Sequence, residues 1–261
     1  VLVSAVNEEL DRMSALPAFQ VFLVGFLPRA DAYEMGVPAV PLGRLYSDEA
    51  WRRFPSVSLR LREPVESLAP DGLRTASGLH TADFYICALP PDRLAAVAPA
   101  LAVDTSWIAY SPITGIHLWF DRPVIDLPHA TLLDRTMQWV FNKDGGRYVQ
   151  LVVSASRSLV EMPRADIISL AMRELADFFP RAAAARLERA HVIKEFRATF
   201  SAAPGTDGRR PPAETAAPGI FLAGDWTRTG WPATMEGAVR SGYLAANAVA
   251  RAAAAPAIIK L

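Results

Sequence analysis

A stretch of small and polar residues near the C-terminal end has the composition and spacing of a ligand-binding loop. Gly224 and Asp225 directly follow the apolar run 220–223, and residues 226–233 contain a glycine and a proline that prevent a regular element. A carboxylate at Asp225 is suited to accept hydrogen bonds from the hydroxyl groups of a sugar-like ligand. A helix expected from Thr234 would direct its first N–H groups towards electron-rich ligand atoms.

The elements that position this loop are predicted from the same segment. Residues 220–223 are typical of a short buried strand, and residues 234–250 of a helix rich in small side chains. Ligands of open α/β sheets bind beyond the carboxyl ends of the strands, which is where this loop would lie. Gly237 and Gly242 lack a Cβ atom, so a ligand or strand can approach the helix closely there.

Two motifs resemble a known family. Gly224-Asp225-Trp-Thr followed by Gly230-Trp-Pro-Ala-Thr-Met-Glu-Gly-Ala-Val-Arg-Ser-Gly resembles the C-terminal flavin-binding signature of the amine oxidase–phytoene desaturase flavoprotein superfamily. Thr114-Gly-Ile-His-Leu-Trp-Phe-Asp-Arg-Pro, with the segments 132–135 and 138–141, resembles the squalene-associated branch, the hydroxysqualene dehydroxylases. The alternative is a βα unit that serves stability only, and the full run on one loop favours flavin binding over it.

The resemblance implies FAD as the cofactor and assigns residues to it. The backbone at Val65 would meet the adenine, and the helix N-terminus would face the N1–O2 side of the reduced flavin. For Glu236 we prefer a helix-dipole role to catalysis. The implied cofactor-binding residues are Val65, Gly224, Asp225, Trp231, Pro232, Ala233, Thr234, Met235, Glu236 and Gly237.

The implied reaction is the reductive dehydroxylation of hydroxysqualene to squalene, with a hydride supplied by reduced FAD. A long apolar tunnel would hold the C30 isoprenoid chain. Four aromatic residues are candidates to line it, with core packing as the equal alternative: Trp119, Phe120, Trp139 and Phe141. The sequence shows no acid–base constellation, so no catalytic residue and no proton donor are assigned.

Three other functions stay open. The first is a carotenoid desaturase of the phytoene type, in which the flavin acts as oxidant. The second is a flavin amine oxidase, whose substrate an aromatic cage would hold; Trp226 and Trp231 could be read as such a cage. The third is a non-catalytic module that binds a hydrophobic ligand without the phosphate-gripping half of an FAD domain.

Composition limits the partners. The 261 residues are 51% hydrophobic and carry a formal net charge of +0, which disfavours a nucleic-acid-binding protein. The basic pairs Arg52-Arg53 and Arg209-Arg210 are interpreted as solvated surface. The single cysteine, Cys87, is predicted to be a buried small side chain, and no disulfide can form within the chain. The four histidines lack ligand spacing, so no metal is expected.

The chain is predicted to be a C-terminal fragment. It begins with valine and contains no Gly-x-Gly-x-x-Gly turn, which the resembled family uses to hold the FAD pyrophosphate. The sequence lacks an apolar run of about 18 residues and a signal peptide. These features favour a cytoplasmic protein, and a water-insoluble substrate adds peripheral contact with the inner membrane face as an option. The oligomeric state is not indicated.

The predicted fold class is α/β with mixed α+β character: part of a Rossmann-like FAD-binding domain with an inserted substrate domain of antiparallel sheet and helices. The expected segments are 1–45 (helical, substrate domain), 46–101 (FAD domain), 102–195 (substrate domain) and 196–261 (FAD domain). Strands are expected at 57–62, 64–68, 82–89, 113–120 and 191–200, a hairpin at 138–154, and helices at 42–54, 91–101 and 163–179. The apolar stripe Phe19, Phe22, Leu23 and Phe26 is interpreted as core rather than as the wall of a lipid cavity.

Overall fold

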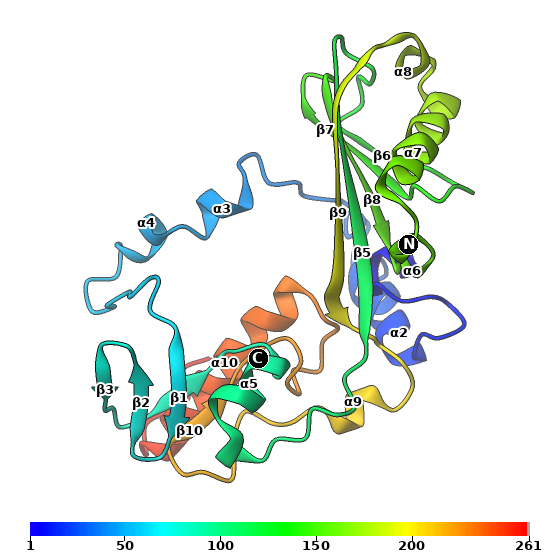
Figure 1. Cartoon of the computed structure of the whole chain (residues 1–261). Coiled ribbons are helices and arrows are strands. Elements are labelled where there is room, and N and C mark those ends of the chain that lie inside the picture. Colours follow the sequence, from blue (N-terminus) through cyan, green and yellow to red (C-terminus); the bar gives the residue numbers. More distant parts are fainter. Residues whose placement is uncertain (260–261) are drawn as a thin grey trace.

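A computed structural model describes residues 1–259 and shows two parts joined by long strands (Figure 1). The upper part is a five-stranded antiparallel sheet in the order β6-β7-β8-β5-β9. Its strands are β5 (Tyr110–Phe120), β6 (His129–Thr131), β7 (Trp139–Asp144), β8 (Tyr148–Ser154) and β9 (Leu187–Phe200). Three helices accompany it: α6 (Arg157–Val160), α7 (Arg164–Phe178) and α8 (Pro180–Ala184).

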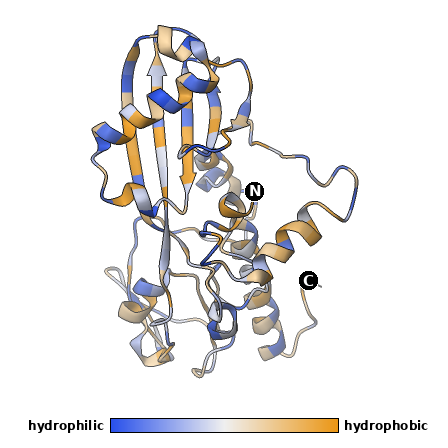
Figure 2. Cartoon of the chain, turned by 90° about the vertical axis from the view of Figure 1, so that its right-hand side faces the viewer, coloured by the Kyte–Doolittle hydropathy of each residue, from blue (hydrophilic) through white to orange (hydrophobic). Residues whose placement is uncertain are grey.

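One face of this sheet is covered and the other is open. Ile116, Leu118 and Phe120 alternate along β5 with less buried residues and pack with Ile167 and Leu175 of α7 in one core. Hydrophobic and hydrophilic residues alternate along the strands in Figure 2, as a half-covered sheet requires. The α7 helix lies on one side of the sheet (Figure 1), and the β5 residues that face the other side, such as His117 and Trp119, are only partly buried.

The predicted hairpin is confirmed as β7 and β8, joined by a glycine turn. Gly145 and Gly146 have φ values of 48° and 81°, a left-handed conformation that glycine adopts readily. A Cβ atom on Gly146 would lie 2.3 Å from the carbonyl oxygen of Ile125. The turn therefore requires glycine at this position for space as well as for conformation.

The lower part contains the predicted strand–loop–helix unit. β10 (Ile220–Leu222) is fully buried and pairs in parallel with β4 (Tyr85–Cys87), whose Cys87 is buried as predicted. The helices beside this pair are α5 (Pro91–Val97), the 3₁₀ helix η1 (Pro99–Leu101) and α10 (Met235–Ala252). A small antiparallel sheet lies next to them: β1 (Val65–Ala69), β2 (Gly72–Thr75) and β3 (Gly78–His80).

The N-terminal residues connect both parts. α1 (Leu2–Val6) ends at Asn7, whose side chain is buried and bonds to three places in the upper sheet region. Its amide nitrogen donates to the Ser111 carbonyl at 3.0 Å and to the Thr199 hydroxyl at 2.8 Å, while its oxygen accepts from the Ala155 N–H at 2.6 Å. The adjacent Glu8 is fully buried against Arg157. This polar cluster anchors the N-terminal segment at the base of β5 and β9.

The remaining helices are α2 (Ala15–Gly25), α3 (Leu42–Leu45), α4 (Asp48–Trp51) and α9 (Thr206–Arg209). The interpretation of the stripe on α2 as core is wrong, because Phe19 and Leu23 are 63% and 59% exposed. Nearly all residues of α2 are apolar, so the spacing of the stripe does not indicate which side of the helix packs against the rest of the protein.

Two further element predictions need correction. Residues 57–62 form no strand, since alternation of side chains makes a strand only where a partner strand supplies hydrogen bonds. The single helix expected over 42–54 is two one-turn helices, α3 and α4, separated at Ser47. β9 continues without interruption past residue 195, across one of the predicted domain boundaries, which otherwise stay predictions.

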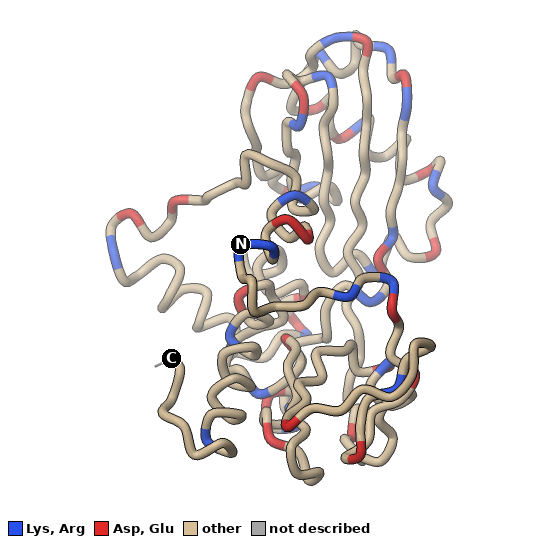
Figure 3. Tube along the Cα trace, turned by 90° about the vertical axis from the view of Figure 1, so that its left-hand side faces the viewer, with Lys and Arg blue, Asp and Glu red and all other residues tan. Residues whose placement is uncertain are grey.

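Charged residues of both signs are interspersed over the two parts (Figure 3). None of the helices within residues 1–259 is both long enough and apolar enough to cross a membrane.

Candidate functional site

A groove lies where the parallel pair β4–β10 meets α10. It has a volume of about 440 Å³ and is lined by the residues after β4, by Gly224, Asp225 and Ala238, and by Tyr110 and Arg197 from β5 and β9. The carboxyl ends of both parallel strands open into it, as predicted for a ligand site of an α/β sheet. Gly224, Asp225 and Trp226 form one wall of the groove, and we call the whole segment 224–234 the Asp225 loop.

The Asp225 loop begins at a glycine that the geometry demands. Gly224 has φ 138°, and a Cβ atom there would lie 2.5 Å from the indole nitrogen of Trp226. Its N–H donates to the Ser241 hydroxyl of α10 at 2.7 Å. The Trp226 indole is buried and donates to the Leu89 carbonyl at 3.1 Å. The start of the loop is thereby fixed to both α10 and the end of β4.

The carboxyl group of Asp225 is half-buried at the groove. Burial raises its pKa above the ordinary value, and the positive charge of nearby Arg210 acts in the opposite direction. No side chain within residues 1–259 donates a hydrogen bond to this carboxylate. Such a half-buried acceptor at the mouth of a groove suits the hydroxyl groups of a bound ligand, as its position in the sequence predicted.

The N-terminus of α10 is capped and closely packed. The Thr234 hydroxyl accepts a hydrogen bond from the Gly237 N–H at 3.1 Å, the usual arrangement of an N-cap residue. A Cβ atom on Gly237 would lie 2.5 Å from the Pro232 carbonyl oxygen. No chain atom lies within 4 Å of a Cβ placed on Gly242, so its predicted role in close approach has no support from the described chain.

The remaining predicted cofactor residues of this region lie on one continuous turn. Pro232 is buried, Trp231, Ala233 and Thr234 are partly buried, and Met235 and Glu236 are exposed at the first turn of α10. Glu236 forms an ion pair with Arg240 at 2.7 Å, which agrees with its helix-stabilising role. The N–H groups of Met235 and Glu236 begin the helix, where a ligand can serve as their acceptor.

The N-cap gives a direct test of the loop geometry. Replacing Thr234 by alanine removes the acceptor for the Gly237 N–H and is expected to lower the free energy of unfolding by about 1 kcal/mol. Replacement by serine keeps the hydroxyl and is expected to change it by less than half of that. Chemical denaturation followed by circular dichroism measures both values, and equal loss in the two variants would contradict the capping role.

Arg210 is the residue of this site that sequence reasoning missed. The interpretation of Arg209-Arg210 as solvated surface holds for the Arg209 side chain, which is 55% exposed, but is wrong for Arg210, which is 3% exposed. The guanidinium group of Arg210 lies under the Asp225 loop and donates hydrogen bonds to it. No periodic pattern marks this arginine, because its partners are carbonyl groups 15 to 21 residues further along the chain.

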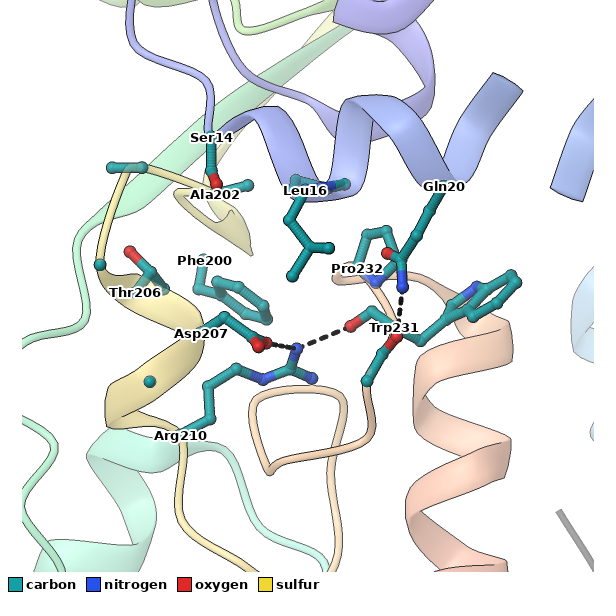
Figure 4. A pocket seen from close by; sticks show the side chains of 15 residues that line it. Ser14, Leu16, Gln20, Phe200, Ala202, Thr206, Asp207, Arg210, Trp231 and Pro232 are labelled. Atoms are coloured by element: carbon teal, nitrogen blue, oxygen red, sulfur yellow. Dashed lines mark hydrogen bonds and ion pairs between the residues drawn. The ribbon is translucent and has the colours of Figure 1, made fainter. Parts of the chain in front are cut away.

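A second, smaller cavity lies on the other side of Arg210 (Figure 4). Its volume is about 240 Å³, and it is bounded by the first turns of α2, the end of β9, α9 and the Gly230–Pro232 segment. The Gln20 side chain of α2 donates to the Gly230 carbonyl at 2.6 Å across its edge. The Asp225 loop is thus held between the groove on one side and this cavity on the other.

The candidate substrate-lining residues divide between the two faces of the upper sheet. Trp119, Trp139 and Phe141 lie partly exposed on the open face, where Trp119 stacks on Tyr148 at 4.5 Å and Trp139 on Phe141 at 5.8 Å. Phe120 is 2% exposed in the core under α7. Adjacent strand residues point to opposite faces, so Phe120 is dropped from the lining set and is a packing residue.

Val65 lies apart from the groove. It begins β1 and lines another cavity of about 370 Å³ together with Arg60, Glu63, Leu73, Thr75 and His80. Glu63 accepts a hydrogen bond from the Thr75 hydroxyl at 2.8 Å within this cluster. The contact of the Val65 backbone with adenine stays a prediction.

The sequence of this chain is similar to those of known flavoproteins. Residues 43–250 match the family model described as flavin containing amine oxidoreductase, and the chain belongs to this family. A hydroxysqualene dehydroxylase of Sinorhizobium fredii is 33% identical over 165 residues, which cover 63% of this chain and 38% of that protein. A 15-cis-phytoene desaturase of an Oncidium hybrid cultivar is 31% identical over 191 residues, covering 65% and 33%.

Solved structures share the fold. Cyclohexylamine oxidase from Brevibacterium oxydans superposes with a TM-score of 0.62 at 14% identity, over 96% of this chain and 62% of that one. The likeness at this identity concerns the fold alone, and it confirms the predicted mixed α/β class. The chain spans only 38% and 33% of the two curated relatives above.

The residues of the groove fit FAD, the cofactor of this family. The half-buried Asp225 carboxylate and Gly224, where a Cβ atom would collide with the chain, line the groove. Gly237 and the N-terminus of α10 lie beside Ala238, which also lines it, whereas the predicted residues Trp231 and Pro232 line the second cavity. Hydroxyl groups of the cofactor suit Asp225, and its electron-rich atoms suit the N–H groups of Met235 and Glu236. The groove therefore has features that suit the flavin of the family to which the chain belongs.

Proposed function

We propose that the protein containing this chain removes the hydroxyl group of a C30 isoprenoid alcohol reductively and converts hydroxysqualene to squalene. Bound FAD supplies the hydride when it is reduced. The observation that carries the substrate class is the open face of the upper sheet, where aromatic side chains from β5, β7 and β8 form one surface. The likeness to the hydroxysqualene dehydroxylase of Sinorhizobium fredii supports the reaction.

The aromatic surface is continuous with the groove through β5. Tyr110 at the start of β5 lines the groove, and Ile113, His117 and Trp119 follow on the open face of the same strand. Burial lowers the pKa of His117, and the neighbouring charges of His191 and Lys143 act in the same direction, which favours the neutral ring. The Arg189 guanidinium lies 3.8 Å from the centre of the Trp119 ring and the Lys143 ammonium 5.6 Å from that of Phe141. The aromatic rings between these cations bind and orient a hydrocarbon chain and exclude water from it.

Of the two alternative enzymes, the desaturase has specific support and the amine oxidase lacks it. A phytoene-type desaturase is supported by the 31% identity to the Oncidium phytoene desaturase and requires the same apolar wall. An amine oxidase would need an aromatic cage, and Trp226 and Trp231 are poorly suited to one. Trp226 is buried and bonded to the Leu89 carbonyl, and the Arg240 guanidinium covers the Trp231 ring at 4.3 Å.

Peripheral contact with a membrane belongs to the same proposal. The exposed residues of α2 include Leu16, Phe19, Phe22, Leu23 and Val24, and α2 is the described helix best suited to touch a lipid surface. Co-sedimentation with lipid vesicles tests this contact, and loss of binding in a Phe19→Ser, Leu23→Ser variant is the expected result. Unchanged sedimentation of that variant would refute the role of α2.

Analysis of the reaction products distinguishes hydroxysqualene from phytoene as the substrate. The protein, photoreduced under anaerobic conditions, is incubated with hydroxysqualene, and the oxidised protein is incubated with phytoene and an electron acceptor. We expect squalene from the first reaction and unchanged phytoene in the second. A desaturated carotenoid without squalene would establish the desaturase instead. Binding of hydroxysqualene or phytoene by a protein that takes up no flavin would establish a binding module.

A further inference from the structure

Arg210 ties together the two ends of the Asp225 loop. One terminal nitrogen, Nη1, donates to the Trp231 carbonyl at 2.8 Å and to the Asp207 carboxylate at 2.9 Å. The other, Nη2, donates to the Asp225 carbonyl at 2.8 Å and to the Thr229 hydroxyl at 2.7 Å. A single rigid, planar group therefore fixes two carbonyls that are six residues apart in the loop (Figure 4 shows the bonds to Asp207 and Trp231).

The burial of the Arg210 guanidinium is not explained by a gain in stability alone. Removing a guanidinium from water is unfavourable unless the charge is well paired. Within the described residues Arg210 has one carboxylate partner, Asp207, which is 49% exposed, and its Nε atom has no acceptor. The Phe200 ring lies 5.2 Å from the guanidinium centre and adds only a weak attraction. Because the guanidinium group is buried under the loop, it can donate hydrogen bonds to the loop carbonyls.

Other hydrogen bonds hold single points of the loop, from Gly224 to Ser241, from the Arg228 N–H to the Pro211 carbonyl at 2.7 Å and from Gln20 to Gly230. Among the described residues, Arg210 is the side chain that bonds to carbonyls near both ends. Between β10 and α10 the loop contains no regular element, and Gly230 takes a left-handed conformation with φ 66°. Thr229 accepts from the Trp231 N–H at 3.1 Å, but that hydroxyl is itself held by Arg210. The carbonyl contacts of Arg210 lie at Asp225, which lines the groove, and at Trp231, four residues before α10 begins at Met235.

We propose that Arg210 is a positioning residue for FAD, which sets the Asp225 carboxylate and the N-terminus of α10 in register for the cofactor without touching it. Two consequences distinguish this role from general stabilisation. The planar fork is needed and a positive charge alone is insufficient, because the two loop carbonyls are held by two different nitrogens of one rigid group. The role concerns FAD binding and is independent of which isoprenoid the protein reduces.

The second consequence concerns how the affinity for FAD depends on pH. Arg210 opposes the rise in the pKa of Asp225 that burial causes. Without the guanidinium charge the carboxyl group takes up its proton at a higher pH, and a protonated Asp225 accepts fewer hydrogen bonds. The affinity of an Arg210→Gln variant for FAD is therefore expected to fall, on acidification, at a higher pH than that of the unaltered protein.

The experiment measures FAD affinity of the flavin-free protein by fluorescence titration, together with its melting temperature. Arg210→Lys keeps the charge and Arg210→Gln removes it, and both are expected to bind FAD about tenfold to a hundredfold more weakly. Arg157→Lys is the matched control, because Arg157 holds the fully buried Glu8 with both terminal nitrogens and, within the described residues, makes no hydrogen bond or ion pair with the Asp225 loop. It is expected to lower the melting temperature and leave FAD affinity within about twofold.

The outcomes separate the interpretations. Wild-type FAD affinity in Arg210→Lys would overturn the need for the fork. Weakening by the same factor in Arg157→Lys would show that Arg210 acts only through stability. An unshifted pH dependence in Arg210→Gln would overturn the electrostatic part. Since no step of the test uses an isoprenoid, failure of the dehydroxylase proposal leaves its result unaffected.

Discussion

Replacing Gly237 by alanine is expected to weaken FAD binding about tenfold to a hundredfold. The added Cβ atom would lie 2.5 Å from the Pro232 carbonyl oxygen, closer than any relaxed contact. Because that atom belongs to the backbone, the Asp225 loop or the first turn of α10 must move. Overpacking of this kind costs about 1–3 kcal/mol, which corresponds to the stated loss of affinity if the shift displaces the loop. Titration of flavin-free protein with FAD measures it.

A glycine elsewhere provides the control. Gly43 lies in α3, and a Cβ atom there has no neighbour within 4 Å. The Gly43→Ala variant is expected to keep the wild-type affinity for FAD and to gain slightly in stability through helix propensity. Wild-type affinity in Gly237→Ala would show that the close packing between Pro232 and α10 has no part in forming the cofactor site.

Replacing Glu8 by glutamine is expected to lower the free energy of unfolding by about 3 kcal/mol. Glu8 is fully buried, and its carboxylate accepts two hydrogen bonds from Arg157, at 2.7 and 3.1 Å, and one from the Ser201 hydroxyl. Removing the Glu8 charge disrupts a buried ion pair and leaves Arg157 with Glu9, at 3.3 Å, as its remaining carboxylate partner among the described residues. Denaturant unfolding at pH 7 measures the change, with Asp126→Asn, an exposed ion-pair residue, as the control expected to change little.

The same pair predicts a dependence on acid. Burial raises the pKa of Glu8, but the hydrogen bonds from Arg157 and Ser201 outweigh it, so that the net pKa lies below its ordinary value of 4.5. A depressed pKa in the folded state contributes stability above pH 4.5, and this contribution is lost as the pH falls through the folded value. Glu8→Gln should show less loss of stability below pH 4.5 than the unaltered protein. Parallel acid-unfolding profiles in the two proteins would contradict the pairing.

The parts of the fold that sequence predicted well are those specified locally. The helix after Thr234 and the β7–β8 hairpin depend on residues within about 20 positions, such as an N-cap or a glycine turn. The strand 220–222 is marked by its own apolar run, although its partner β4 lies at residues 85–87. The resemblance of the Asp225 loop to a flavin-binding signature also comes from residues that are neighbours along the chain, and the cofactor contacts of these residues stay predictions.

The parts that sequence could not predict depend on distant contacts. Arg210 differs from Arg209 only in what lies above it, which is a loop that begins 14 residues later. Trp119 and Phe120 are both aromatic and adjacent, and only the position of α7 decides which of them is covered. The exposure of α2 is similar: an all-apolar helix carries no mark of which side will be buried.

The most direct test of the cofactor site and its reaction is an absorbance spectrum of the protein containing this chain. We expect flavin bands at about 375 and 450 nm in the purified protein. After anaerobic photoreduction, addition of hydroxysqualene should restore these bands while squalene forms in equal amount. Restored bands with no squalene would contradict the proposed substrate. Absence of flavin bands, even after incubation with FAD, would contradict the assignment of the groove at Asp225 as a cofactor site.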